Sequence, residues 1–155
     1  MNPLNGLLGC AGIWRGTNRL EDPHIKSPED SFATALVSPM LGGRFVRIDY
    51  TWVFYGDPQE GSILFGYEKK SDLVTAYWID TWHLDDKVMI CTGAPAEGEL
   101  NVLGSYAPPT GPDWGWRIIV TPNEGKTFII KMFNVEPEGR ELFAVESQYR
   151  RGEDN

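Results

Sequence analysis

The sequence predicts an all-β protein, a closed up-and-down antiparallel barrel of about ten strands with a short N-terminal helix. Apolar and polar residues alternate along most of the chain, which is the pattern of strands with one buried face. Gly, Pro, Asn and Asp separate the alternating segments at short, regular intervals. No helical crossover pattern lies between them, so neighbouring strands are expected to pair in an antiparallel way. Closure removes exposed sheet edges, which favours a barrel over a Greek-key sandwich.

The helix is expected within residues 1–11, where Asn2 can act as a cap and Pro3 suits the first turn. The rest of the chain divides into ten alternating segments. We expect strands at residues 12–20, 31–38, 44–55, 62–69, 72–83, 87–92, 99–106, 114–121, 127–135 and 140–151. Pro39 is expected to end the second strand, and the Gly-Asp-Pro sequence at 56–58 is expected to form a turn.

Length and charge limit the classes of function. The 155 residues are the usual size of one domain, so residues 1–155 are expected to form a single barrel. The net charge of −8 argues against binding to nucleic acids or anionic membranes, because both attract Lys and Arg. No apolar stretch approaches ~18 residues and no signal-like start occurs, so we expect a cytoplasmic protein. Cys10 and Cys91 are expected to be reduced there, with a bridge between them as the alternative.

Residues 72–83 form the strongest candidate for the wall of a functional site. Trp78, Asp80 and Trp82 lie two residues apart and therefore share one face of a regular strand. His83 then points to the opposite face, so a direct contact between Asp80 and His83 is not expected unless the strand bulges at Trp82. If the tryptophan face points inward, Asp80 is either a structural, hydrogen-bonded carboxylate or a group that acts on a ligand. The sequence leaves both interpretations open.

Aromatic residues make up 12% of the chain and include six tryptophans, which suits a barrel with a lined pocket as well as a packed core. The candidates for ligand binding are taken from the apolar faces of the strands. They are Tyr50, Trp52, Tyr67, Trp78, Asp80, Trp82, Trp116 and Tyr149. No residue is assigned a catalytic role, because no nucleophile elbow, phosphate-binding loop or His-Glu-x-x-His sequence occurs. Two isolated histidines without nearby cysteines predict no metal site.

Short motifs along nearly the whole chain resemble the calycin superfamily of β-barrels, which includes lipocalins, fatty-acid-binding proteins and nitrobindins. The Gly-Ile-Trp sequence at 12–14 is similar to the Gly-x-Trp start of these proteins, and the Tyr-Arg-Arg sequence at 149–151 is similar to their closing strand. Between them lie Leu-Gly-Gly-Arg-Phe at 41–45, Gly-Tyr at 66–67 and Trp-Ile-Asp at 78–80. The whole pattern most resembles an uncharacterised bacterial family of lipocalin-like domains.

The resemblance implies a barrel with an internal pocket for a small, mostly apolar ligand, and it supplies no activity. It also implies a structural contact at the base of the barrel, in which Arg150 or Arg151 packs over Trp14. Nitrobindins carry haem on a histidine near the C-terminus, whereas residues 140–155 of this chain contain no histidine. Haem would therefore have to bind through His83.

The sequence as a whole favours a protein that binds a small hydrophobic or amphipathic ligand inside a barrel, with no cofactor. An enzyme that transfers a proton with Asp80 and either His83 or a tyrosine is one alternative. Haem binding through His83 is another. A third is a scaffold that forms a homodimer through an exposed aromatic strand.

Overall fold

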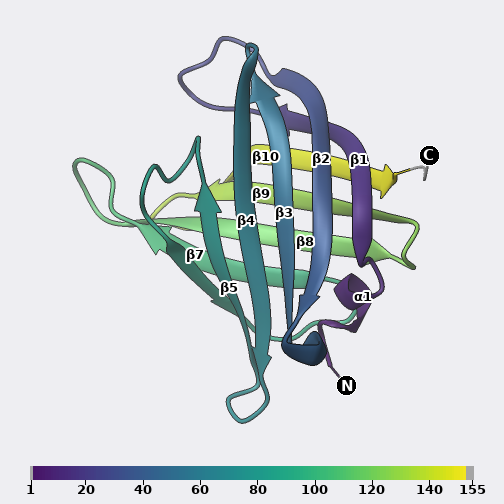
Figure 1. Ribbon diagram of the computed structural model, residues 1–155. Helices are drawn as coiled ribbons and strands as arrows, with labels where there is room; N and C mark the ends of the chain where they lie inside the picture. The colour runs from purple at the N-terminus through teal and green to yellow at the C-terminus, as the bar shows by residue number, and fades with distance from the viewer. Residues whose placement is uncertain (1, 153–155) are drawn as a thin grey trace.

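The computed structural model describes residues 2–152 and confirms the predicted fold class, a closed barrel of ten antiparallel strands with one short helix at its N-terminus (Figure 1). Each strand pairs with the next in sequence, and β1 pairs with β10 to close the barrel. The elements are α1 (Asn5–Leu8), β1 (Gly12–Leu20), β2 (Glu29–Met40), the 3-10 turn η1 (Leu41–Gly43), β3 (Phe45–Phe54), β4 (Asp57–Glu68), β5 (Leu73–Asp80), β6 (Met89–Gly93), β7 (Leu100–Tyr106), β8 (Trp114–Asn123), β9 (Thr127–Val135) and β10 (Glu141–Arg151).

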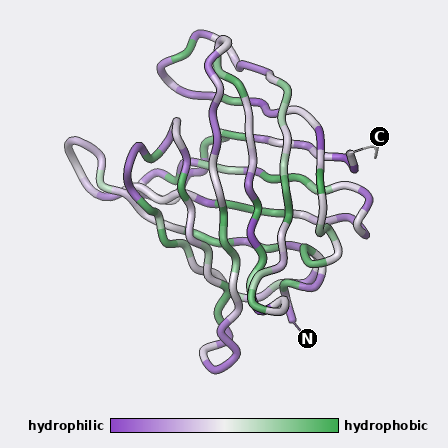
Figure 2. Tube along the Cα trace, viewed as in Figure 1, coloured by the Kyte–Doolittle hydropathy of each residue, from purple (hydrophilic) through white to green (hydrophobic). Residues whose placement is uncertain are grey.

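Alternate residues of each strand face the barrel interior. In β5, Val74, Ala76 and Trp78 are buried. Tyr77 and Ile79, which alternate with them, are exposed on the outer surface. Figure 2 shows hydrophobic and hydrophilic stretches succeeding one another along the strands. Burial of the inward faces supplies the main stabilising free energy of the barrel, at about 25 cal/mol per Å² of apolar surface.

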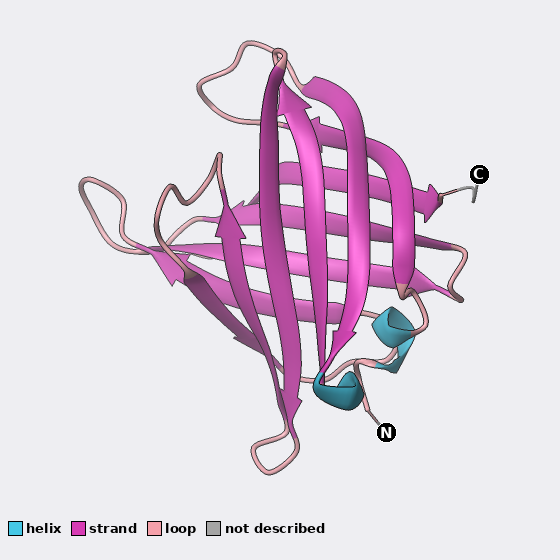
Figure 3. Cartoon of the chain, viewed as in Figure 1, coloured by secondary structure: helices cyan, strands magenta, loops and turns pink. Residues whose placement is uncertain are grey.

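The N-terminal segment closes one end of the barrel. The helix α1 is a single turn, shorter than the expected 1–11 segment, of which residue 1 lies outside the described residues. Asn2 lies before the helix, and its Oδ1 accepts a hydrogen bond from the Leu4 backbone N–H at 3.0 Å. Leu4 and Leu7 are fully buried, so the helix acts as a plug. Figure 3 shows α1 and η1 at the same end of the barrel.

Several strands extend beyond their predicted ends, and the structure shows the physical reason for two of them, β2 and β4. Pro39 lies inside β2 and pairs with Val46, although it was expected to end that strand. β1 starts at Gly12 opposite Val37, so past this point β2 has no neighbour on that side and the missing N–H of proline costs no ladder bond. β4 starts at Asp57 because Tyr55 and Gly56, with φ of 44° and 85°, form a two-residue hairpin turn.

One seam of the barrel is weakly paired. A single residue pair, Thr92 with Leu103, joins β6 to β7, whereas the other neighbouring strands share ladders of five or more pairs. No helix among residues 2–152 combines the length and apolarity needed to cross a membrane.

Candidate functional site

The end of the barrel opposite α1 contains two hollows of very different size. We call the larger one the mouth hollow. It has a volume of about 750 Å³, and its main side chains are Phe54, Trp78, Trp82, His83, Tyr106 and Trp116. The smaller one, the inner cavity, lies deeper and has a volume of only about 10 Å³. Its lining includes Asn18, Tyr50, Trp52, His83, Ser147 and Tyr149. Because His83 lines both, its side chain lies at the boundary between them.

Asp80 and His83 are in direct contact, which corrects the expectation that they point apart. β5 ends at Asp80, and residues 81–86 form turns, so the two-residue alternation of a strand no longer holds beyond Asp80. The turn places His83 Nδ1 3.0 Å from Asp80 Oδ1. The expected strand at 72–83 is therefore wrong at its C-terminal end, and Trp82 belongs to the turn rather than to the inward face of β5.

The Asp80 carboxylate is buried and fully used as an acceptor. Its Oδ1 accepts the backbone N–H groups of Trp82 and His83, both at 2.8 Å, in addition to the imidazole. Its Oδ2 accepts the Tyr50 hydroxyl at 2.5 Å. Burial raises the pKa of Asp80, but the hydrogen bonds and charge of His83 and the bond from Tyr50 outweigh it, and the net pKa lies below its ordinary value. Asp80 is thus a stable carboxylate and a poor proton acceptor, which leaves His83 as the candidate base.

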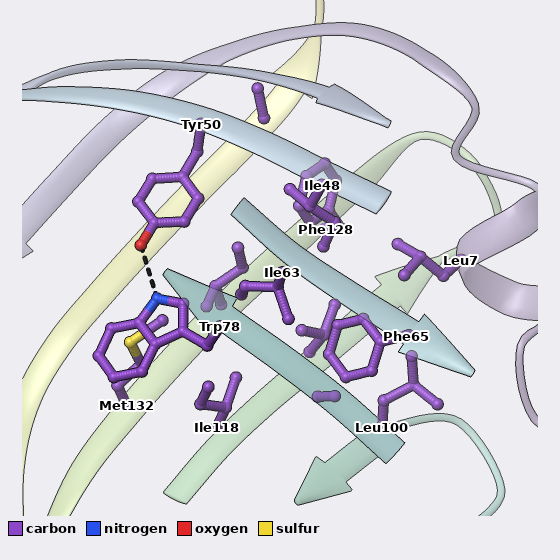
Figure 4. Packing of buried hydrophobic residues seen from close by; sticks show 14 of the residues in the cluster. Leu7, Ile48, Tyr50, Ile63, Phe65, Trp78, Leu100, Ile118, Phe128 and Met132 are labelled. Atoms are coloured by element: carbon purple, nitrogen blue, oxygen red, sulfur yellow. Dashed lines mark hydrogen bonds between the residues drawn. The ribbon is translucent and has the colours of Figure 1, made fainter. Parts of the chain in front are cut away.

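Tyr50 reaches Asp80 across an intervening strand. Figure 4 shows the side chains of Tyr50 on β3 and Trp78 on β5 pointing toward each other, and Trp78 Nε1 donates to the Tyr50 hydroxyl at 2.9 Å. Gly61 on β4 lies between them and pairs with both Tyr50 and Asp80. A Cβ at Gly61 would come within 2.3 Å of the Tyr50 hydroxyl oxygen, so the bond to Asp80 requires glycine there. Burial, followed by the charge and hydrogen bond of Asp80, raises the pKa of Tyr50 well above its ordinary value.

Three tryptophans surround the His83 ring. Its centroid lies 5.1 Å from Trp116, 5.5 Å from Trp78 and 6.3 Å from Trp52. Asp80 is the only hydrogen-bond partner of the His83 side chain within residues 2–152. A neutral imidazole that donates through Nδ1 keeps the Nε2 lone pair, so Asp80 selects the tautomer in which Nε2 can accept a proton or bind a ligand.

Trp116 carries the one buried side-chain nitrogen or oxygen in the described chain that has no hydrogen-bond partner, its indole Nε1. Its ring stacks on Trp78 with 5.2 Å between centroids and an interplanar angle of 13°. An unpaired buried donor costs roughly 1–3 kcal/mol. The mouth hollow therefore contains a tryptophan held by stacking whose polar group is unsatisfied.

The outer part of the mouth hollow is aromatic. Trp82 packs on Phe54 with centroids 4.1 Å apart and meets Trp52 edge to face at 6.0 Å. Tyr106 lines the same space and donates to Asn134 Oδ1 at 2.5 Å. Sequence reasoning missed Phe54 and Tyr106 as site residues. Phe54 lies in the expected 44–55 strand, in alternation with Tyr50 and Trp52, but nothing in the sequence indicated that this strand end borders a hollow.

Five of the eight predicted ligand-binding residues do not line the mouth hollow: the inner cavity is lined by Tyr50, Trp52, Asp80 and Tyr149, and Tyr67 lines neither. Tyr67 is near the opposite end of β4, where its hydroxyl donates to Asp72 Oδ1 at 2.6 Å, which removes it from the candidate site. Tyr149 is buried on β10, stacks on Phe128 with 4.6 Å between centroids, and lines the inner cavity instead. Burial raises the pKa of Tyr149 to about 12, so it stays a hydroxyl at neutral pH.

At the base of the barrel, the structure separates the two arginines that the sequence could not distinguish. The Arg151 guanidinium lies over Trp14, 4.3 Å from the ring centroid, whereas Arg150 is exposed on the outward face of β10. Arg151 also donates to the backbone carbonyls of three loop residues, Gly9, Ala11 and Gly125. Arg150 therefore has no part in closing the base.

These features define a small β-barrel with a buried carboxylate–imidazole pair at an aromatic mouth. Residues 5–151 match the family described as "Protein of unknown function (DUF1579)", and the chain belongs to this family. No curated protein matches the chain. It is similar to the structure entitled "Crystal Structure of Rv2717c from M. tuberculosis", with 12% identity, a TM-score of 0.61 and coverage of 97% of this chain and 98% of that chain. A likeness at this identity shows the fold alone, and the calycin resemblance stays a prediction because neither match names that superfamily.

Proposed function

We propose that this protein binds a small amphipathic ligand in the mouth hollow, held by aromatic side chains with its polar end toward His83. The volume of about 750 Å³ is within the usual range for small-molecule sites, roughly 300–1,000 Å³. The inner cavity, at about 10 Å³, has room for about one water molecule. We therefore place the ligand in the mouth hollow rather than deep inside the barrel, where the sequence led us to expect it.

The aromatic lining is the observation that carries this proposal. Two other concave regions of about 670 and 610 Å³ lie along the barrel, so volume alone does not choose the site. Those regions are lined largely by outward-facing residues of the strands, such as Thr34 and Arg47 in one and Thr17 and Gln148 in the other. The mouth hollow instead combines several large rings with one free imidazole nitrogen, which is the usual composition of a ligand site.

A titration with a neutral fluorescent probe tests the proposal. We expect N-phenyl-1-naphthylamine to bind with a gain in probe emission and quenching of tryptophan emission. Phe54→Ala is expected to weaken binding by roughly 10-fold, because it removes one wall of the hollow. Phe32→Ala is the matched control, since Phe32 is exposed on the outer face of β2 and its loss is expected to leave binding unchanged. Equal effects of the two variants, or no binding at all, would contradict the proposal.

The Asp80–His83 contact favours a second candidate function, proton transfer to a bound ligand. His83 Nε2 would act as the base, and Asp80 would orient the ring and stabilise the imidazolium that forms. The test is deuterium uptake at the α-carbon of a bound ketone, followed by NMR. We expect uptake with the wild-type protein and its loss in His83→Gln. An unchanged rate in that variant would exclude His83 as the base.

The same nitrogen is compatible with haem as the alternative ligand. A histidine whose other ring nitrogen is held by a carboxylate is the usual arrangement of a metal-ligating histidine, and haem would supply redox or gas-binding chemistry there. Among residues 2–152, no cluster of three His, Cys, Asp or Glu side chains could hold a metal ion. Haem added to the purified protein is expected to give a Soret band that His83→Gln removes if this alternative holds, and no shifted band if it does not.

Compartment and assembly are also proposals. Cys10 and Cys91 are both free and buried, which supports a reducing, cytoplasmic environment. Tyr77, Ile90 and Leu103 are exposed on the outer face of β5, β6 and β7, which supports a homodimer through these strands. Sedimentation at several protein concentrations tests the homodimer, and a monomer at the highest concentration would exclude it.

A further inference from the structure

The inner cavity is lined by apolar side chains, among them Ile130, Met132 and Val145, together with a small group of polar ones. Asn18 on β1 and Ser147 on β10 are each only 4% exposed and both point inward. The Ser147 hydroxyl donates to Asn18 Oδ1 at 2.7 Å. The Asn18 amide nitrogen makes no hydrogen bond within residues 2–152 and, unlike Trp116 Nε1, it is not completely enclosed by other atoms. Buried polar groups are costly unless they are paired, so apolar side chains at these positions would serve a purely structural interior better.

His83 lines both this cavity and the mouth hollow, and its ring packs among three tryptophans. Its imidazole makes one hydrogen bond, to Asp80 Oδ1. If the ring rotates away, Asp80 keeps the bonds from Tyr50 and from the backbone N–H groups of Trp82 and His83. The carboxylate is therefore not left unpaired, and a rotation of the ring away from the boundary would join the two hollows, since both are lined by His83.

The charges around the inner cavity select against anions. No Lys or Arg side chain lines it, and Asp80 contributes a buried negative charge. The available donors are neutral, namely the Asn18 amide and the Tyr149 hydroxyl. A carboxylate placed there would be desolvated beside Asp80, and the His83 imidazole, the one lining side chain that can carry a positive charge, is already paired with Asp80. A neutral oxygen could accept from the neutral donors.

We propose that the inner cavity is a binding subsite for the neutral oxygen of a hydroxyl or carbonyl head group, that His83 gates access to it, and that carboxylates are rejected. This inference rests on the proposed function, because it places the polar end of the same ligand. The apolar part of the ligand would stay among the rings of the mouth hollow. The ligand class is then an alcohol or ketone with an apolar body rather than a fatty acid.

Three probes with eight carbons test the head group: 1-octanol, 2-octanone and octanoate, each titrated near neutral pH by displacement of N-phenyl-1-naphthylamine. We expect the two neutral probes to bind at least about 10-fold more tightly than octanoate. Equal or tighter binding of octanoate would overturn the inference and leave ligand binding at the mouth intact. Failure of all probes, the dye included, would instead contradict the proposed function.

Variants separate the subsite from the gate. Asn18→Leu fills the subsite with an apolar side chain of similar size. We expect it to lower the affinity for 1-octanol by roughly 10-fold and to leave the affinity for the dye unchanged. Gln148→Leu, at an exposed position of β10, is the matched control and is expected to change neither the affinity for 1-octanol nor that for the dye. Tyr149→Phe, which removes the other donor of the subsite, serves the same purpose if Asn18→Leu does not fold, as judged by circular dichroism. Unchanged 1-octanol affinity in a folded subsite variant would overturn the inference.

His83→Ala removes the gate. We expect it to raise the affinity for 1-octanol by roughly 10-fold, because the free-energy cost of opening is no longer part of binding. His83→Phe retains a ring of similar size at the boundary and is expected to give no such gain. An equal response of the two variants, or a loss of affinity in His83→Ala, would contradict the gate.

Discussion

The two ends of this barrel are built from similar residues but in opposite ways. At the base, the Trp14 indole donates to the Cys10 carbonyl at 2.7 Å, and the Arg151 guanidinium covers its ring. At the mouth, Trp116 is also buried, but its indole N–H has no partner. His83 lies beside it with one ring nitrogen free. The base is thus satisfied and closed, whereas the mouth keeps unpaired polar groups next to a hollow.

This difference shows where the chain accepts a cost in stability. Buried polar groups are normally paired, and each exception calls for a physical explanation. At the base, the one buried tryptophan is satisfied by a carbonyl and a cation. At the mouth, the unpaired groups concentrate where a ligand has room to enter. The comparison therefore supports a structural base and a functional mouth, and the predictions below test it from the largest expected effect to the smallest.

Trp14→Ala is expected to cause the largest loss of stability, about 3–5 kcal/mol in the free energy of unfolding. The side chain is fully buried, packs edge to face on Phe128 at 4.9 Å, and carries the Arg151 contact. Urea denaturation measures the loss. Trp82→Ala, at the half-buried mouth, is the control and is expected to cost less than about 2 kcal/mol. Equal losses would mean that the two ends do not differ in this way.

Gly61→Ala is expected to cost about 1–3 kcal/mol and to break the contact between Tyr50 and Asp80, because the new methyl group overlaps the Tyr50 ring. Tyr50→Phe in the same background removes the hydroxyl and relieves part of the overlap. The two changes together should therefore cost less than the sum of the separate changes. Full additivity in denaturant unfolding would show that the contact does not depend on Gly61.

Asp80→Asn is expected to cost about 1–3 kcal/mol at neutral pH. The folded-state pKa of Asp80 is lowered, so its contribution to stability is fully present above the unfolded-state pKa, about 3.9, and is lost as the pH falls through the lower folded-state value. The difference in unfolding free energy between wild type and variant should stay constant above about pH 5 and shrink below about pH 4. Asp85→Asn, in the same turn but exposed, should show no such pH dependence.

Arg151→Met is expected to have the smallest effect, about 1 kcal/mol, through loss of the contact with Trp14 and of the bonds to loop carbonyls. Arg150→Met is the matched control, because the neighbouring side chain is exposed on the outward face, and it should change the unfolding free energy by less than about 0.5 kcal/mol. A larger effect at Arg150 would contradict the assignment of the base contact to Arg151.

Much of the fold could be predicted because alternation and turn residues are local signals. The range 12–20 for β1 and 127–135 for β9 agrees with the structure at both ends. Strand ends that depend on the neighbouring strands of the sheet were harder to predict. Pro39 continues β2 only because β1 has already ended beside it, and this cannot be read from the residues around Pro39.

The candidate site shows the same limit more clearly. The sequence placed Trp78 and Asp80 on one face of a strand without deciding where that face points, and the structure buries both. It could not place His83, because alternation describes a strand and the strand ends at Asp80. It also could not identify Gly61 as a site residue. Glycine is required at this position only because Tyr50 and Asp80 pair with it from the two neighbouring strands.

The sequence by itself determined the barrel, its sidedness and the short plug, because alternation, turn chemistry and the need to remove sheet edges act on neighbouring residues and apply to the whole chain. Only the tertiary structure decided which arginine covers Trp14, that Asp80 holds His83, and that the space lies at the mouth rather than inside. These features depend on side chains that are far apart in sequence or that follow a turn. Their positions are fixed by closure of the barrel and by packing, which no local pattern encodes.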